Sequence, residues 1–243
     1  MIDELVVAGG TIETVTIENG PFRAEFLNLG ASLRSLTAPD LRGEPGNVVL
    51  GYRDLEQYRG RPRFYGAVAG RYANRIGGAR FSLDGRAYDL PKNNGAHNLH
   101  SGPLGFDQRF WAIEGHDARS VHFSLLSPAG ENGFPGNLHV DLHYALEADG
   151  LAIRFAATTD AATVVNLTHH AYFNLAGEDS GQSVLGQWLQ IPAGRFTPVE
   201  DQIPTGVLQD VAGTPFDFLR AKPIGADIVE QDEQLRARQR LRP

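Results

Sequence analysis

The chain has 243 residues, of which 42% are hydrophobic and 21% are charged, a composition typical of a soluble globular protein with a packed core. Its formal net charge of −7 and its lack of cysteine exclude a basic nucleic-acid-binding face, a disulfide framework and a thiolate nucleophile. We therefore expect no nucleic-acid partner.

The amino terminus carries Asp3 and Glu4 and lacks the basic start and long apolar core of a signal peptide. No stretch approaches the roughly 20 apolar residues of a membrane-spanning helix. These features predict a cytoplasmic protein without a membrane partner.

Helical patterns are scarce and are limited to residues 55–59 and 224–236. The runs 121–125 and 138–144 instead alternate apolar and polar residues, as half-buried antiparallel strands do.

Two Asp-Gly pairs separate strand-like runs and predict type I′ hairpin turns, in which both central residues need positive φ. Asp84-Gly85 joins residues 79–83 to 86–90, and Asp149-Gly150 joins 142–146 to 151–155. Many short strands with turn signals between them predict an all-β protein, either a sandwich or a barrel. Since the sequence has no repeat and no evident linker, we expect one domain over residues 1–243.

Polar residues are concentrated in two runs, 70–76 and 93–102, on either side of the first hairpin. Amides, imidazoles and glycines in such density are typical of a loop that lines a polar pocket. The alternative is a polar surface turn. From the residues alone, His100 fits either interpretation, and Arg75 alone fits a surface charge on a strand.

The run 164–175 mixes strand-forming and polar residues. At strand spacing, one face presents a hydroxyl, an imidazole and a phenol, from Thr168, His170 and Tyr172, while His169 lies on the opposite face. These groups suit a hydroxyl-rich ligand such as a sugar. A half-buried histidine beside a tyrosine, with only a structural role, is the alternative.

Two histidine pairs have spacings found in zinc sites, His97 with His100 and His139 with His143. A four-residue offset along a strand separates the second pair by about 13 Å. We therefore interpret His139 and His143 as solvated residues and assign no metal.

Six motifs follow one another along most of the chain. They are Gly70-Arg71 with Asn74-Arg75-Ile76, Asn93-Asn94-Gly95 leading to Leu99-His100, Gly105-Phe106-Asp107 before Trp111, Gly133-Phe134-Pro135-Gly136-Asn137, Asn166-Leu167-Thr168 with His170 and Tyr172-Phe173-Asn174-Leu175, and Gly213-Thr214-Pro215-Phe216-Asp217-Phe218. In this order they resemble the successive motifs of the aldose 1-epimerase (galactose mutarotase) family. The shared order makes the resemblance more specific than any one motif.

The resemblance implies a large antiparallel β-sandwich that interconverts the α and β anomers of a free aldose such as galactose or glucose, without a cofactor. His170 corresponds to the general acid toward the ring oxygen. Asn74, Arg75, His100 and Tyr172 correspond to sugar-holding positions, and His100 is also counted with the catalytic residues. The resemblance does not fix the oligomeric state, which we expect to be a monomer or a homodimer.

The resemblance fails near Arg236, where the family continues through a Gly-Tyr-Asp-His segment to a catalytic glutamate. Neither segment is present in residues 237–243, and Glu230 and Glu233 match no catalytic motif. We expect an incomplete sandwich that lacks its carboxyl-terminal strands. Residues 237–243 can be encoded by codons that, read one nucleotide later, contain the missing Gly-Tyr-Asp sequence. We therefore predict that a reading-frame slip produced the present carboxyl terminus. A catalytically impaired sugar-binding relative is the alternative to an active enzyme.

Overall fold

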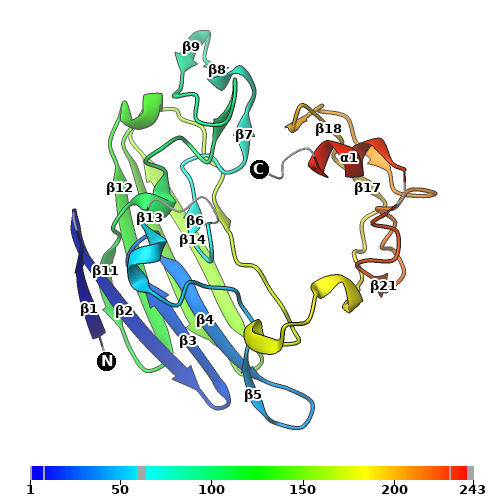
Figure 1. The fold of residues 1–243 in the computed structure, drawn as a ribbon. Helices are drawn as coiled ribbons and strands as arrows, with labels where there is room; N and C mark the ends of the chain where they lie inside the picture. Colours follow the sequence, from blue (N-terminus) through cyan, green and yellow to red (C-terminus); the bar gives the residue numbers. More distant parts are fainter. Residues whose placement is uncertain (1, 8, 60–63, 230, 240–243) are drawn as a thin grey trace. The chain divides into compact units, whose positions relative to one another are not determined.

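The computed structural model describes residues 2–7, 9–59, 64–229 and 231–239, which form two compact units, Met1–Asp179 and Ser180–Pro243 (Figure 1). That the whole chain forms one domain stays a prediction. Strands dominate the described residues, so the fold is all-β, as the alternating sequence pattern predicts. No helix within these ranges is long and apolar enough to cross a membrane.

The first unit contains a five-stranded antiparallel sheet in which neighbouring strands follow chain order. Val15 and Ile17 of its longest strand lie on one face and belong to the main core. Ile12, three residues before Val15, lies on the opposite face and packs in a second apolar cluster with Leu27 and Tyr58. Its strands are β1 (Ile2–Val7), β2 (Gly10–Asn19), β3 (Phe22–Leu27), β4 (Ser32–Pro39) and β5 (Pro45–Asn47).

The second sheet is an antiparallel meander of β11 (Ala112–His116), β12 (Ser120–Ser127), β13 (Leu138–Leu146) and β14 (Leu151–Thr159). Every second residue of β13 is buried, beginning with Leu138. The two sheets share one core, in which Phe26 stacks on Tyr144 with ring centroids 4.3 Å apart. This packing of two apolar faces is the predicted sandwich.

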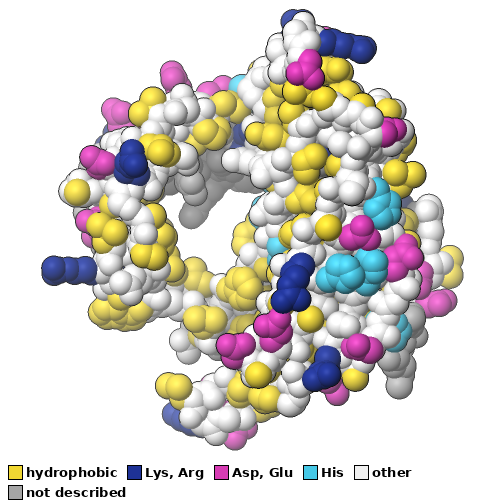
Figure 2. All heavy atoms as spheres, turned by 180° about the vertical axis from the view of Figure 1, so that it is seen from behind, with side chains coloured by type: hydrophobic (Ala, Val, Ile, Leu, Met, Phe, Trp, Pro, Cys, Tyr) yellow, Lys and Arg dark blue, Asp and Glu magenta, His cyan; other side chains and the backbone are white. Residues whose placement is uncertain are grey.

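The opposite face of β12 and β13 is polar and carries histidines beside acidic residues, visible from behind in Figure 2. His122 Nε2 lies 2.8 Å from an oxygen of Asp141, and its ring stacks on that of His143. His139 Nδ1 lies 3.3 Å from the other oxygen of Asp141. The interpretation of His139 and His143 as solvated strand residues is confirmed, since both are exposed.

Both predicted hairpins form, but only one has the predicted turn. Asp84 and Gly85 have φ values of 49° and 76° between β8 (Arg80–Leu83) and β9 (Arg86–Asp89). The type I′ turn predicted at Asp149-Gly150 is wrong, because neither residue has positive φ. The Glu147 N–H donates to the Gly150 carbonyl at 2.8 Å, so the chain reverses one residue earlier than the Asp-Gly pair suggests.

Two short strand pairs connect segments that are far apart in sequence and carry the candidate site. β6 (Val68–Ala69) pairs with β15 (Thr168–His169), and β7 (Arg75–Ile76) pairs with β10 (Asn98–Leu99). A bridge between Tyr72 and Asn166 lies beside them. These pairings bring the motifs at 70–76, 97–102 and 166–174 together at one side of the sandwich.

The second unit contains short strand pairs and one helix, α1 (Glu233–Gln239). Its strands are β16 (Trp188–Leu189) with β21 (Lys222–Pro223), β17 (Arg195–Phe196) with β20 (Gln209–Asp210), and β18 (Val199–Glu200) with β19 (Ile203–Pro204). Single 3₁₀ turns occur along the chain at Leu55–Tyr58, Gly77–Ala79, Phe106–Gln108, Glu131–Gly133, Glu178–Ser180 and Val184–Gly186.

Both predicted helical segments are shorter in the structure than the sequence suggests. Residues 55–59 form only the short 3₁₀ turn Leu55–Tyr58. The helix predicted over 224–236 begins only at Glu233, because the Ile224 and Gly225 N–H groups donate to Gln187 and Leu185 instead of to a helical ladder. Glu230 and residues 240–243, on which part of the carboxyl-terminal prediction rests, lie outside the described residues.

Candidate active site

His100 lies just after β10 and is held by Asn74, which lies just before β7. The His100 N–H donates to the Asn74 carbonyl at 2.9 Å, and the Asn74 N–H donates to His100 Nδ1 at 3.0 Å. Both residues have positive φ, 50° and 63°, a conformation that few non-glycine residues adopt. The two loops thus fix the orientation of an imidazole that is only 7% exposed.

Burial, followed by the charges of His170 and Arg75, lowers the pKa of His100 to about 4. His100 is therefore neutral near pH 7. Because Nδ1 accepts the Asn74 N–H, the single proton of the neutral ring is on Nε2. His100 thus presents a hydrogen-bond donor at Nε2.

His170 follows β15 and faces His100, with ring centroids 5.4 Å apart. Its N–H donates to the Ala67 carbonyl, and its own carbonyl accepts from the Gly66 N–H. Phe64 packs against both imidazoles, at 4.7 Å from His100 and 5.5 Å from His170. Burial also lowers the pKa of His170 below its usual value.

Tyr172 extends this group, with its ring 5.0 Å from that of His170. Its side chain is 39% exposed, so it forms the solvent side of the group. We call His100, His170, Phe64 and Tyr172 the imidazole cluster. The predicted shared face of His170 and Tyr172 is confirmed by this contact.

His169 turns the other way, toward the sandwich core. Its ring lies edge-on to that of buried Tyr144, 5.7 Å away. Burial, followed by the charge of His170, lowers the pKa of His169 to about 4. Its Nε2 is buried without a hydrogen-bond partner among the described residues. His169 is thus a neutral structural residue.

Arg75 lies beside the cluster, where two amides hold its guanidinium. Nε donates to Asn94 Oδ1 at 2.9 Å, and Nη1 lies 3.3 Å from Asn74 Oδ1. All five predicted site residues therefore lie in one neighbourhood: Asn74, Arg75, His100, His170 and Tyr172.

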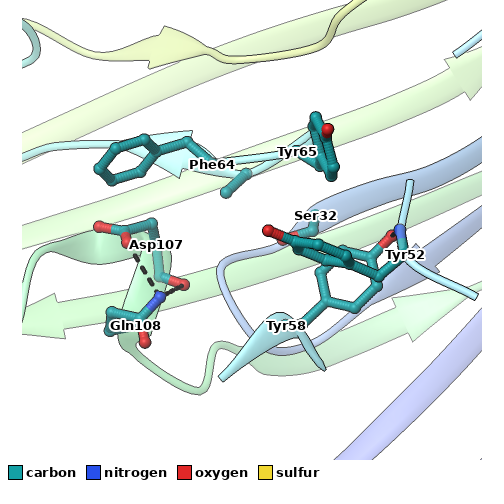
Figure 3. A pocket seen from close by; sticks show the side chains of 8 residues that line it. Ser32, Tyr52, Tyr58, Phe64, Tyr65, Asp107 and Gln108 are labelled. Carbon is teal, nitrogen blue, oxygen red and sulfur yellow. Dashed lines mark hydrogen bonds between the residues drawn. The ribbon is translucent and has the colours of Figure 1, made fainter. Parts of the chain in front are cut away.

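A small cavity lies next to the imidazole cluster and is covered by Phe64 and Tyr65 (Figure 3). The sequence did not reveal the residues that line this cavity. The buried carboxyl group of Asp107 also lines it, and Gln108 Nε2 donates to Asp107 Oδ2 at 3.0 Å. Burial raises the pKa of Asp107 to about 6. The Gly105-Phe106-Asp107 motif was the only sequence signal, and it gave Asp107 no role.

Arg71 was also missed as a structural residue, although it begins the motif containing Asn74 and Arg75. It is 1% exposed. Nη1 donates to the carbonyls of Pro135 and Gly136 at 2.7 and 2.9 Å, and Nη2 donates to the carbonyl and hydroxyl of Ser127 at 2.8 and 2.6 Å. Arg71 therefore joins the site loop to the connection between β12 and β13.

The spacing of His97 and His100 does not produce a chelating pair in this structure. His97 Nδ1 accepts from the Gly78 N–H, just as His100 Nδ1 accepts from Asn74. Within the described ranges, no group of three histidine, aspartate or glutamate side chains is placed to hold a metal ion.

Comparisons with known proteins agree with the motif pattern. The family model described as aldose 1-epimerase matches residues 13–238. The chain is 38% identical over 228 residues to the galactose mutarotase of Bos taurus, covering 93% of this chain and 66% of that protein. It is 41% identical over 211 residues to the aldose 1-epimerase of Escherichia coli K12, covering 86% of this chain and 60% of that protein. The chain thus spans less than two thirds of the length of these relatives.

Solved structures show the same fold. A crystal structure of galactose 1-epimerase from Lactobacillus acidophilus superposes with a TM-score of 0.85 at 28% identity, covering 98% of this chain and 71% of that one. A GalM/aldose epimerase homologue from C. elegans gives a TM-score of 0.83 at 34% identity, covering 88% of this chain and 66% of that one.

Proposed function

We propose that this chain, which belongs to the aldose 1-epimerase family, binds a free aldose at the imidazole cluster and interconverts its α and β anomers. The observation that carries the proposal is the contact between buried His100 and partly buried His170, whose imidazoles lie among aromatic side chains. Hydroxyl-rich ligands need directional donors and acceptors next to apolar surfaces, and this cluster supplies both.

In the proposed complex, His100 donates its Nε2 proton to a sugar oxygen, because Nδ1 is already occupied by the Asn74 N–H. Tyr172 offers its ring and hydroxyl at the exposed side. The guanidinium of Arg75, already oriented by Asn94, supplies further donors to hydroxyl groups. A neutral His100 makes these bonds without placing a second charge beside His170.

His170 has the role of proton donor to the ring oxygen in this proposal. Protonation of that oxygen accompanies cleavage of its bond to the anomeric carbon, while the anomeric hydroxyl transfers its proton to a solvent water molecule and becomes the aldehyde carbonyl. Rotation about the adjacent carbon–carbon bond and reclosure then give either anomer, with both protons returned. The lowered pKa of His170 makes its imidazolium a stronger acid, and it also decreases the fraction of the ring that carries the proton near neutrality.

The anomeric proton requires an acceptor. No carboxylate among the described residues forms an ion pair or hydrogen bond with His100 or His170. This observation favours a second candidate function, sugar binding without rapid mutarotation. In that case the imidazole cluster retains affinity while the anomers interconvert at the solvent rate.

Two measurements on the same protein test the proposal. Polarimetry of fresh α-D-galactose and α-D-glucose measures mutarotation, and calorimetry with the equilibrated sugars measures binding. We expect faster mutarotation that is lost in His170→Asn. Binding without acceleration would support the second candidate. No binding of either sugar would contradict both.

A further inference from the structure

Asparagine is followed directly by glycine at three places in the chain, Asn19-Gly20, Asn94-Gly95 and Asn132-Gly133. Asparagine is one of the chemically labile residues of proteins. In an Asn-Gly pair the backbone nitrogen of the glycine attacks the asparagine side chain, because a residue without Cβ leaves this nitrogen unhindered and the backbone free to turn. Since the three pairs are identical, differences in their reactivity come from the structure around them.

Asn94 and Gly95 begin a tight turn in the second site motif. The Asn94 N–H donates to the His97 carbonyl at 3.2 Å, and the His97 N–H donates to the Asn94 carbonyl at 3.0 Å. Gly95 has a φ of 58°, whereas the φ of Ala96 is not positive, which is the pattern of a type II′ turn. Both of these residues are exposed. Within the described ranges no acceptor is hydrogen-bonded to the Gly95 N–H, so this nitrogen is available for attack.

Arg75 activates the side-chain carbonyl group of Asn94. Its Nε–H donates to Asn94 Oδ1 at 2.9 Å, and the guanidinium keeps its positive charge throughout the working pH range. Attack on the amide carbon moves negative charge onto this oxygen. A donor that is already aimed at the oxygen stabilises that charge, as the donors of an oxyanion hole do. Arg75 is therefore placed to promote attack at this asparagine.

The other two pairs are held by hydrogen bonds that oppose the reaction. Asn19 Nδ2, the leaving group at the first pair, donates to the carbonyls of Leu146 and Glu147 at 2.8 and 3.1 Å. At the third pair the attacking nitrogen is bound instead, because the Gly133 N–H donates to the Gly130 carbonyl at 3.0 Å. The structure thus favours Asn94 over both of the other asparagines.

We propose that Asn94 is a site of spontaneous deamidation promoted by Arg75, and that the product weakens sugar binding. The Gly95 nitrogen forms a bond to Asn94 Cγ and loses its proton to water, while Nδ2 leaves as ammonia, which gives a cyclic imide. Water then adds to one of the two imide carbonyls and opens the ring to aspartate or isoaspartate. The net reaction consumes one water molecule and releases one molecule of ammonia.

The new carboxylate changes the charge around Arg75. It forms an ion pair with the guanidinium that the amide oxygen of Asn94 already contacts, and a charge-assisted hydrogen bond is roughly twice as strong as a neutral one. The donors of Arg75 then stay with position 94 instead of reaching a sugar hydroxyl group. The loss of affinity rests on the proposed function, whereas the deamidation does not.

Peptide mass spectrometry measures the reaction at each pair. The folded protein and the urea-unfolded chain are incubated at mildly alkaline pH and digested, and the peptides are analysed for the conversion of amide to acid and for isoaspartate. The unfolded chain gives the intrinsic rate of each pair. In the folded protein we expect Asn94 to react about tenfold faster than Asn19 or Asn132. Equal rates at the three sites, or a slower rate at Asn94, would overturn the proposal.

Arg75→Met removes the donor and keeps a side chain of similar length. It should slow the reaction at Asn94 about three- to tenfold and leave the rates at Asn19 and Asn132 unchanged. A variant that only loosened the fold would instead move those two rates toward their values in the unfolded chain. Asn94→Gln should abolish the modification at this position, because attack on the longer side chain requires a larger ring. An unchanged rate at Asn94 in Arg75→Met would exclude the role of the guanidinium.

Asn94→Asp reproduces the product and tests its effect on the site. Calorimetry with galactose should show a dissociation constant about three- to tenfold higher than that of the wild type. Asn132→Asp, the matched control, adds the same charge at another Asn-Gly pair and should leave the constant unchanged. Equal affinity of Asn94→Asp and the wild type would contradict the loss of binding. A wild type that binds no sugar would contradict the proposed function and this loss together, while the peptide masses still decide the deamidation.

Discussion

His100 and Asn74 hold each other through two hydrogen bonds, one between their backbones at 2.9 Å and one from the Asn74 N–H to His100 Nδ1 at 3.0 Å. Because Nδ1 accepts this second bond, the neutral ring of His100 carries its proton on Nε2. Nδ1 thus has the structural role, and Nε2 has the proposed role in binding. Substitutions that mimic one nitrogen at a time can therefore separate the two roles.

His100→Asn places an amide oxygen near the position of Nδ1 and removes the donor at Nε2. We expect it to keep most of the stability and to weaken sugar binding by about 1–3 kcal/mol, the cost of a lost buried hydrogen bond. His139→Ala, on the exposed face of β13, is the control. Calorimetric affinity that is equal in both variants would place the sugar elsewhere.

Arg75→Ala tests the rim of the site and should weaken sugar binding by about 1–3 kcal/mol through lost hydrogen bonds. Removal of its charge should also raise the pKa of His100, since that charge contributes to lowering it. Titration of the His100 ring by NMR measures the second effect. An unchanged His100 pKa would show that the two groups do not interact.

His170→Asn removes the proposed proton donor but keeps a polar side chain of similar size. Polarimetry should show no acceleration by this variant, while its denaturation midpoint stays close to that of the wild type because His170 is only partly buried. A variant that kept its rate would exclude His170 as the acid.

Asp107→Asn should stabilise the protein most at alkaline pH. The folded-state pKa of about 6 lies above the ordinary value near 3.9. The stability contributed by Asp107 is therefore present below about pH 4 and lost as the pH rises through 6. We expect Asp107→Asn to raise the free energy of unfolding by about 1–3 kcal/mol at pH 8. At pH 5 the increase should be smaller than at pH 8 by about 1 kcal/mol. Urea denaturation at the two pH values measures this difference. An equal effect at both would contradict a buried titrating carboxyl group.

Arg71→Met should destabilise the fold by about 3–5 kcal/mol, because it leaves buried carbonyl acceptors without donors. Arg71→Lys keeps the charge but lacks the planar fork that reaches Ser127 and Pro135 together, so we expect an intermediate loss. Chemical denaturation compares the three proteins. Equal stability of Arg71→Met and the wild type would show that these bonds contribute no net stability.

Alternation along the chain predicted β12 and β13, because one face of each is buried in the sandwich. It also predicted the opposite orientations of His169 and His170, which depend only on strand geometry. The motifs grouped the five site residues. The turn at Asp149-Gly150 was mispredicted, since the pairing of Glu147 with Gly150 moved the reversal to Ala148 and Asp149.

The residues that were missed depend on long-range packing. Phe64 has no motif of its own and contacts His170 because β6 pairs with β15, which lies far along the chain. Asp107 has an unusual pKa because of burial that no local pattern reports. A single sequence shows the periodicity of each strand, but it does not show which side chains come into contact when distant segments pack together.

The two tryptophans of the chain lie in different compact units and in opposite surroundings. Trp111 is 2% exposed, with its indole N–H bonded to the Phe106 carbonyl at 3.1 Å, whereas Trp188 is 69% exposed. Emission from Trp111 should be blue-shifted and should move to longer wavelength when the sandwich melts, while Trp188 already emits near the wavelength of solvated indole. With Trp188→Phe, fluorescence reports the sandwich alone, and with Trp111→Phe it reports residues 180–243. The chain thus contains its own optical probes for deciding whether its two units unfold together or in sequence.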